Sequence, residues 1–172
     1  MRYQAADNMG RLVGRQRPID LHRPPDTRFM DLKGSTQLYL VVCNAKNLTL
    51  ASDERNWRIM WRVGDQGVGW RYLQLDRELG CSFYTNWGPY TKMDGLEGHY
   101  PIELGEFTLE QRQQWEEIAS NLLPPVPHGA NGSQEWIEEL LRIAVERNLI
   151  DRQVVNRCLD LARRPFLHSA VL

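Results

Sequence analysis

Between residues 36 and 104 the hydrophobic and polar positions follow the short periods of β-strands. The clearest case runs from Arg55 to Val63, where apolar and polar residues alternate, so that successive side chains fall on opposite faces of a strand. Gly64-Asp-Gln-Gly67 then supplies a hairpin turn. We expect four to five strands, at residues 37–43, 55–63, 68–75, 81–87 and 99–104, with a loop over residues 88–98.

From residue 107 onward the period becomes helical. Thr108 and Gln111 match the capping box of a helix that should run to about Leu122. A second helix is expected over residues 134–147, where apolar residues form one broad stripe, and a third over residues 151–163. Strands first and helices after predict an α+β fold, in which an antiparallel sheet is followed by three helices packed on one face.

The first 35 residues differ from the rest of the chain. They carry seven basic and four acidic side chains, few apolar residues, and Pro18, Pro24 and Pro25. We interpret residues 1–35 as a flexible or loosely docked leader, and residues 36–172 as a single α+β domain. The arginines of the leader are scattered without aromatic residues between them, which does not favour a nucleic-acid-binding tail.

Composition excludes several classes of protein. The 172 residues contain 21 basic and 22 acidic side chains, a balance that argues against a nucleic-acid partner. No apolar run approaches the ~20 residues of a membrane span, and the first residues lack the apolar core of a signal peptide, so a cytoplasmic location is expected. The three cysteines are widely spaced, and the four histidines form no metal-binding motif. We therefore expect no metal and no cofactor.

Arginines and tryptophans suggest a site for a small molecule. Arg58 and Arg62 lie on the polar face of the strand that begins near Asn56, and we expect Arg71 of the next strand to join them. Aromatic residues with a few polar groups are typical of small-molecule clefts, so the candidate ligand-binding residues are Trp57, Arg58, Arg62, Arg71 and Trp136. The alternative is that these arginines pair with the acidic helical half, because residues 103–151 hold ten acidic and three basic side chains.

Two short motifs carry a resemblance to a known family. Asn56-Trp-Arg-Ile59 opens a strand, and Asn131-Gly-Ser-Gln-Glu-Trp136 opens an amphipathic helix. Together they resemble the circularly permuted papain-like fold of the lecithin-retinol acyltransferase-like proteins and of small fungal families. In that fold, the resemblance implies, the strand supplies a catalytic His and the start of the helix supplies a nucleophilic Cys. A helix N-terminus lowers a thiol pKa, and a facing imidazole accepts the proton.

This chain departs from the family at both reactive positions. Asn56 stands where the His is expected, and Ser133 stands where the Cys is expected. An amide takes up no proton at neutral pH, and a serine without a base is a poor nucleophile. The resemblance implies that Asn56 and Ser133 lie within several ångströms of each other, and His99 is the remaining histidine of the domain that could serve there as acid or base. Asn56 and Ser133 also have a purely structural interpretation. Asn131 and Gln134 match a capping box, which makes Ser133 an ordinary residue of the first helical turn. Asn56 is then a polar residue without a catalytic role.

Three hypotheses for function remain. The first is a small-molecule-binding biosynthetic protein, such as a cyclase or isomerase, on a papain-like scaffold that has lost its Cys–His pair; as an enzyme it would not be a standard Cys–His hydrolase. The second is a non-catalytic interaction module. The third is a hydrolase or acyltransferase that uses Ser133, or Cys81 if the alignment is shifted. A homodimer is compatible with each of them.

Overall fold

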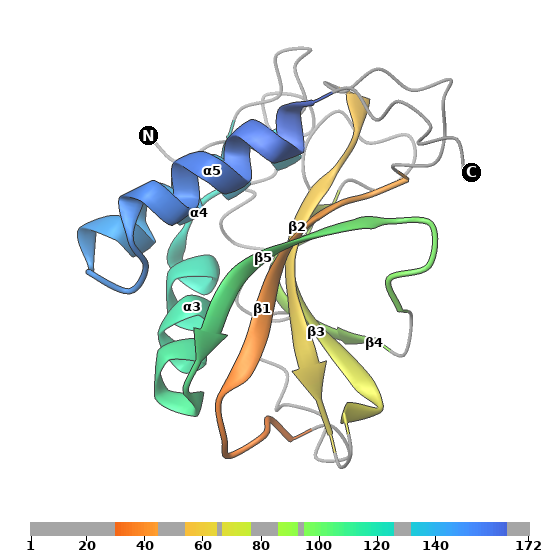
Figure 1. Ribbon diagram of the computed structural model, residues 1–172, viewed down its shortest axis with the longest axis vertical. Helices are drawn as coiled ribbons and strands as arrows, with labels where there is room; N and C mark the ends of the chain where they lie inside the picture. Colours follow the sequence, from red (N-terminus) through yellow and green to blue (C-terminus); the bar gives the residue numbers. More distant parts are fainter. Residues whose placement is uncertain are drawn as a thin grey trace, which may run out of the picture.

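Five strands form one antiparallel sheet in the computed structural model, which describes residues 30–44, 54–64, 67–76, 86–92, 95–125 and 132–164. The strand order is β4-β3-β2-β1-β5, and three helices follow the strands along the chain (Figure 1). The expected α+β fold is therefore confirmed. The elements are β1 (Thr36–Val42), β2 (Trp57–Val63), β3 (Gly69–Asp76), β4 (Asn86–Lys92), β5 (Tyr100–Phe107), α3 (Leu109–Asn121), α4 (Gly132–Glu146) and α5 (Arg152–Arg163).

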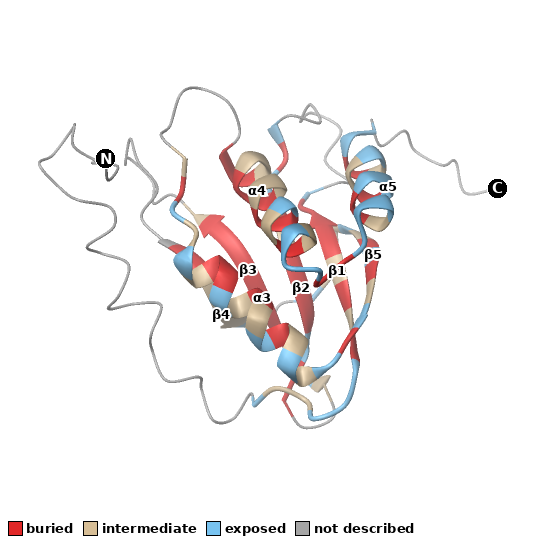
Figure 2. Ribbon diagram, turned by 90° about the vertical axis from the view of Figure 1, so that its left-hand side faces the viewer, coloured by how far each residue is buried: buried red, intermediate tan, exposed pale blue. Residues whose placement is uncertain are grey.

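The three helices cover one face of the sheet, which we call the helix-covered face (Figure 2). Every second residue of β2 points into the core between this face and the helices, as the alternation predicted. Five of the six tryptophans lie in this core: Trp57, Trp61, Trp87, Trp115 and Trp136. Burying such large apolar side chains removes much surface from water, which is the main favourable term in folding.

The helix starts follow the sequence signals. The Thr108 hydroxyl accepts the backbone N–H of Gln111, and the Gln111 side chain accepts the backbone N–H of Thr108, so the capping box is complete. The carboxylate of Asp151 caps α5 by accepting the backbone N–H of Gln153 at 2.6 Å. Each cap satisfies backbone donors that a helix leaves without internal partners.

Strand β4 begins where the expected strand over residues 81–87 should end. It extends through Gly88 and Pro89 to Lys92, a stretch expected to be a loop, while residues 81–85 lie outside the described part of the chain. Glycine and proline usually indicate turns, but proline is tolerated at the edge of a sheet, where one side of the strand makes no ladder. β4 is such an edge strand, since it pairs only with β3 among the described strands.

The end of the expected leader docks on the domain. Of residues 1–35 the structure describes residues 30–35, and there the carboxylate of Asp31 receives hydrogen bonds from Trp61 Nε1 at 3.1 Å and from the fully buried Arg112. Arg112 also donates to the backbone carbonyls of Leu32 and Gly34. This segment is therefore part of the packed domain.

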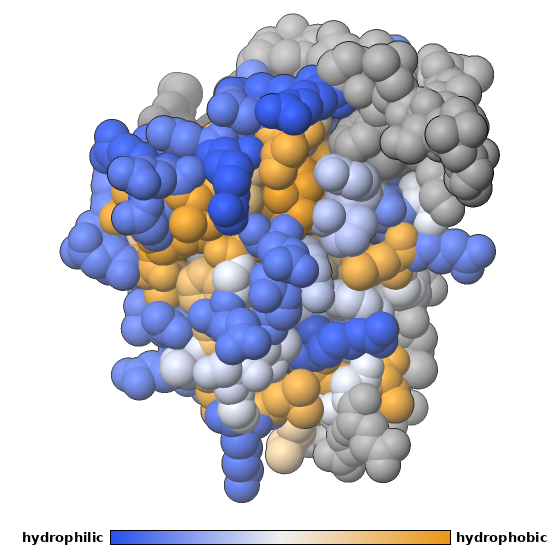
Figure 3. Space-filling model, viewed as in Figure 1, coloured by the Kyte–Doolittle hydropathy of each residue, from blue (hydrophilic) through white to orange (hydrophobic). Residues whose placement is uncertain are grey.

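The opposite face of the sheet, which we call the second face, has a smaller cluster of its own. Val41, Met60, Trp70 and Tyr72 are each at most 3% exposed and pack together there. Tyr39 meets Trp70 edge to face, with ring centroids 6.3 Å apart. On the view of Figure 3, hydrophobic residues reach the surface in separate patches between hydrophilic ones.

Candidate functional site

Asn56 and Ser133 lie side by side although 77 residues separate them. Ser133 is in the first turn of α4 and Asn56 directly precedes β2. The Ser133 hydroxyl donates to Asn56 Oδ1 at 3.2 Å and accepts the backbone N–H of Trp57 at 3.1 Å. The expected proximity of the two side chains is confirmed.

The geometry resembles that of a nucleophile and its base, but the chemistry differs. The acceptor of the Ser133 proton is an amide oxygen, which does not take up protons at neutral pH. Ser133 is also only 3% exposed. This contact therefore offers the Ser133 hydroxyl no general base, and it joins α4 to the start of β2 as a clamp.

The neighbours of Ser133 strengthen this clamp. Gln134 Nε2 donates to the carbonyl of Arg55 at 2.8 Å, and Trp136 Nε1 donates to the carbonyl of Leu122 at 3.2 Å. Trp136 and Trp57 are each 1% exposed in the helix-side core. These two tryptophans, expected to contact a ligand, are core residues in the folded chain; Asn131, the other polar residue of the motif, lies outside the described residues.

His99 directly precedes β5, and its imidazole bonds to the end of β1. Its Nδ1 accepts the backbone N–H of Asn44 at 3.0 Å, while the N–H of the adjacent Cys43 donates to the carbonyl of Asn56 at 2.8 Å. Burial, reinforced by the positive charge of Arg58, lowers the pKa of His99 below its ordinary value of 6.5. A neutral imidazole is thus favoured, with Nδ1 used as a structural acceptor.

Arg71 was expected on the same face as Arg58 and Arg62, and this expectation is wrong. The register pairs Arg71 with Trp61, which places both on the helix-covered face. Arg71 Nε there lies 3.2 Å from the carboxylate of Glu116 on α3. For this arginine the alternative interpretation, an ion pair with the acidic helices, holds.

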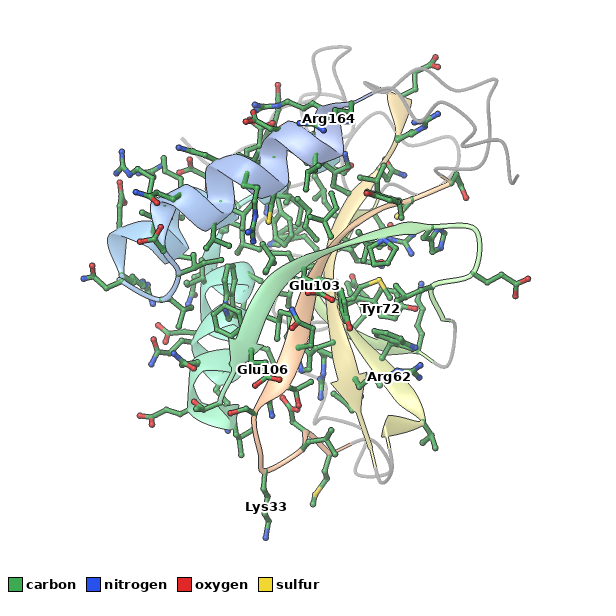
Figure 4. All side chains as sticks on the ribbon, in the orientation of Figure 1. Lys33, Arg62, Tyr72, Glu103, Glu106 and Arg164 are labelled. Atoms are coloured by element: carbon green, nitrogen blue, oxygen red, sulfur yellow. The ribbon has the colours of Figure 1, made fainter. Side chains whose placement is uncertain are left out.

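Arg58 and Arg62 do lie on the second face, above aromatic rings. The Arg62 guanidinium is 4.0 Å from the ring centroid of Trp70, and that of Arg58 is 5.6 Å from the ring centroid of Tyr72. Figure 4 shows Arg62 and Tyr72 on the side of the sheet away from the helices. Lys92 of β4 adds a third cation, 5.8 Å from the same tyrosine ring. No carboxylate of the described residues forms an ion pair with any of these three cations.

Polar groups border the cations on the neighbouring strands. Gln74 of β3 is 1% exposed and donates through Nε2 to Asp76, but its Oε1 has no hydrogen-bond donor in the described part of the chain. Cys43 follows β1, where burial raises the pKa of its thiol, while Arg58 and Lys92 partly oppose that rise and Asp76 adds to it. Arg58, Lys92 and Asp76 therefore all lie close enough to act on one thiol.

Sequence reasoning missed Lys92 and Gln74. Lys92 fell in the expected loop of residues 88–98, so it could not be assigned to a face of the sheet. Gln74 continues the alternation that places Trp70 and Tyr72 on one face of β3, and that pattern could have identified it. Cys81, the alternative nucleophile, lies outside the described residues.

No family model matches the chain, and no curated protein or solved structure matches it either. Within the described ranges no three histidine, cysteine, aspartate or glutamate side chains gather in a way that could hold a metal ion. None of the helices described here has the length and apolar character needed to cross a membrane.

Proposed function

We propose that the chain is a small-molecule-binding protein whose ligand is an anion held on the second face of the sheet. The observation that carries this proposal is the group of three cations, Arg58, Arg62 and Lys92, above the rings of Trp70 and Tyr72 with no ion-pair partner among the described residues. Cations near flat apolar surface can bind an anion and an attached ring together.

With respect to Cys–His chemistry the protein is, in this proposal, a pseudoenzyme. The amide of Asn56 occupies the place of the base, and Ser133 is buried in a clamp. If the scaffold is of the permuted papain-like type, as in the small fungal families, its ligand site has moved from the helix N-terminus to the other face of the sheet. A biosynthetic role, a cytoplasmic location and a homodimer are compatible with this proposal.

A flat aromatic anion tests the proposal directly. We expect 8-anilinonaphthalene-1-sulfonate to bind saturably to the folded chain, measured by fluorescence titration. The double variant Arg58→Met/Arg62→Met should weaken binding at least tenfold, because methionine keeps the apolar length of the side chains and removes their charge.

The matched control is Arg152→Met on α5, where the arginine is exposed and belongs to another surface. This variant should bind like the wild-type chain. Circular dichroism must show that each variant is folded. Absence of saturable binding, or equal binding by the double variant and the wild-type chain, would contradict the proposed function.

A further inference from the structure

The second face carries, besides its cations, a buried hydrogen-bond acceptor without a donor. The side chain of Gln74 is 1% exposed, and its Oε1 finds no donor in the described part of the chain. The neighbour of Gln74 on β4 is Gly88, which has no side chain that could donate. On β2 the register sets Arg58 opposite Gln74, but the guanidinium of Arg58 lies over the ring of Tyr72. Buried acceptors in folded proteins are nearly always satisfied, so this oxygen indicates a donor that is supplied from outside the described chain.

Cations and acceptors lie beside one another in this region. The register that pairs Ile59 with Leu73 sets Arg58 opposite Gln74, and the charged groups of Arg58 and Lys92 lie 5.6 and 5.8 Å from the ring centroid of Tyr72. Asp76 accepts from Gln74 Nε2, and among the described residues it forms no ion pair with Arg58 or Lys92. Both cations are therefore available to an anion.

No hydrogen bond or ion pair with another described residue holds Arg58 or Lys92 in place. Lys92 is exposed and Arg58 is half-buried. Arg62, in contrast, is held by a hydrogen bond from Nη1 to the carbonyl of Gly67 at 3.0 Å. The two long side chains can swing off the tyrosine ring and admit a flat molecule beneath them.

From this arrangement we infer that the ligand is a phosphorylated heteroaromatic molecule with an amino group on its ring, such as a purine nucleotide. The phosphate binds Arg58 and Lys92, the ring stacks on Tyr72, and the amino group donates to Gln74 Oε1. This inference rests on the proposed function and specifies the chemistry of its ligand.

Four probes separate the three contacts. Adenosine 5′-monophosphate has phosphate, ring and amino group; purine riboside 5′-monophosphate lacks the amino group; adenosine lacks the phosphate; ribose 5-phosphate lacks the ring. By isothermal titration calorimetry we expect adenosine 5′-monophosphate to bind at least tenfold more tightly than each of the other three. A site built to hydrogen-bond its ligand binds analogues more weakly when they leave its buried polar groups without a partner.

Variants assign each contact to a residue. Gln74→Met should remove the preference for adenosine 5′-monophosphate over its analogue without the amino group, while the affinity for that analogue stays within twofold. Lys92→Met should weaken binding of both nucleotides about tenfold and leave adenosine unaffected. Arg152→Met, on the exposed part of α5, should change none of these affinities.

If Gln74→Met does not fold, the comparison of the two nucleotides on the wild-type chain still tests the acceptor. Equal affinity for the two nucleotides, or for adenosine and its monophosphate, would overturn the inference. If 8-anilinonaphthalene-1-sulfonate binds through Arg58 and Arg62 while the nucleotides do not bind, this inference fails and the proposed function stands. If neither kind of probe binds, both fail.

Discussion

Arg112 of α3 donates through Nε to both carboxylate oxygens of Asp31, at 3.0 and 3.1 Å, across 81 residues of sequence. The side chain of Arg112 is fully buried, and its Nη1 also donates to the carbonyls of Gly34 and Phe107. A guanidinium in such a place is stable only because its charge and all its donors are matched. The pair therefore fixes residues 31–34 to the start of α3.

Removing Asp31, the partner of the buried Arg112, should destabilise the fold. We expect Asp31→Ala to lower the free energy of unfolding by about 3–5 kcal/mol, measured by urea denaturation, because Arg112 would be left buried and uncompensated. Deleting residues 1–29, which keeps Asp31, should shift the melting temperature by only a few degrees. Asp160→Ala, at an exposed position of α5, is the matched control. A small effect of Asp31→Ala would show that the pair is not needed for stability.

Glu116, also on α3, should make stability depend on pH. Burial raises the pKa of its carboxyl above 4.5, Arg71 lowers it, Asp31 raises it and Arg112 lowers it, with the net direction upward. The folded chain therefore holds this proton more tightly than the unfolded chain. The resulting stabilisation is fully present below pH 4.5 and is lost as the pH rises through the raised pKa.

Glu116→Gln removes this titration. Between pH 4 and 7 the wild-type chain should lose stability relative to the variant, and urea denaturation at several pH values would measure the difference. Glu117→Gln, an exposed change on the same helix, should keep the wild-type pH dependence. Parallel curves for the wild-type chain and Glu116→Gln would contradict the raised pKa.

The sequence predicted secondary structure better than it predicted the site. Alternation along β2 and the capping box at Thr108 depend on local spacing, and both appear in the structure. The face on which Arg71 lies depends on its register with Trp61, and polarity alone suggested the wrong face. Gly88 and Pro89 indicated a loop because composition does not reveal that a strand lies at the edge of a sheet.

For the residues of the candidate site, too, the sequence predicted some features and missed others. The proximity of Asn56 and Ser133 was expected from the resemblance of their two motifs to the permuted papain-like fold, and the two side chains do meet. The burial of Ser133 could not be read from the motif, since it depends on how closely α4 packs on the sheet. The unpaired acceptor of Gln74 likewise becomes visible only when every neighbouring donor has been placed.

His99 should also make the stability of the fold depend on pH. Its folded pKa lies below 6.5, so the folded chain binds this proton less readily than the unfolded chain. Stability should therefore be lost as the pH falls from 6.5 through the lowered pKa, where protonation also removes the acceptor of the Asn44 N–H. His99→Asn, which retains an acceptor oxygen, should reduce this loss.

The variant Arg58→Met tests whether the charge of Arg58 contributes to the lowered pKa of His99. Because Arg58 contributes to lowering the pKa of His99, its removal should raise that pKa toward 6.5, as followed by NMR titration of the imidazole. Burial is the larger cause and persists, so the pKa should remain below 6.5 in this variant. A pKa of His99 unchanged by Arg58→Met would show that the two groups do not interact.

The clamp at the start of α4 offers a last test of the proposed ancestry. The double change Asn56→His/Ser133→Cys places an imidazole and a thiol where an amide and a hydroxyl are now 3.2 Å apart. The new sulfur would keep the position that accepts the Trp57 N–H, at a helix N-terminus, and both features favour a thiolate. We expect its alkylation by iodoacetamide at pH 6, mapped by mass spectrometry, to be at least tenfold faster than in Ser133→Cys alone. The single variant has the same burial and the same helix, so the difference isolates the imidazole. Equal rates in the two variants would mean that the strand and the helix do not hold a nucleophile–base geometry, and the resemblance to the permuted papain-like fold would lose its chemical support.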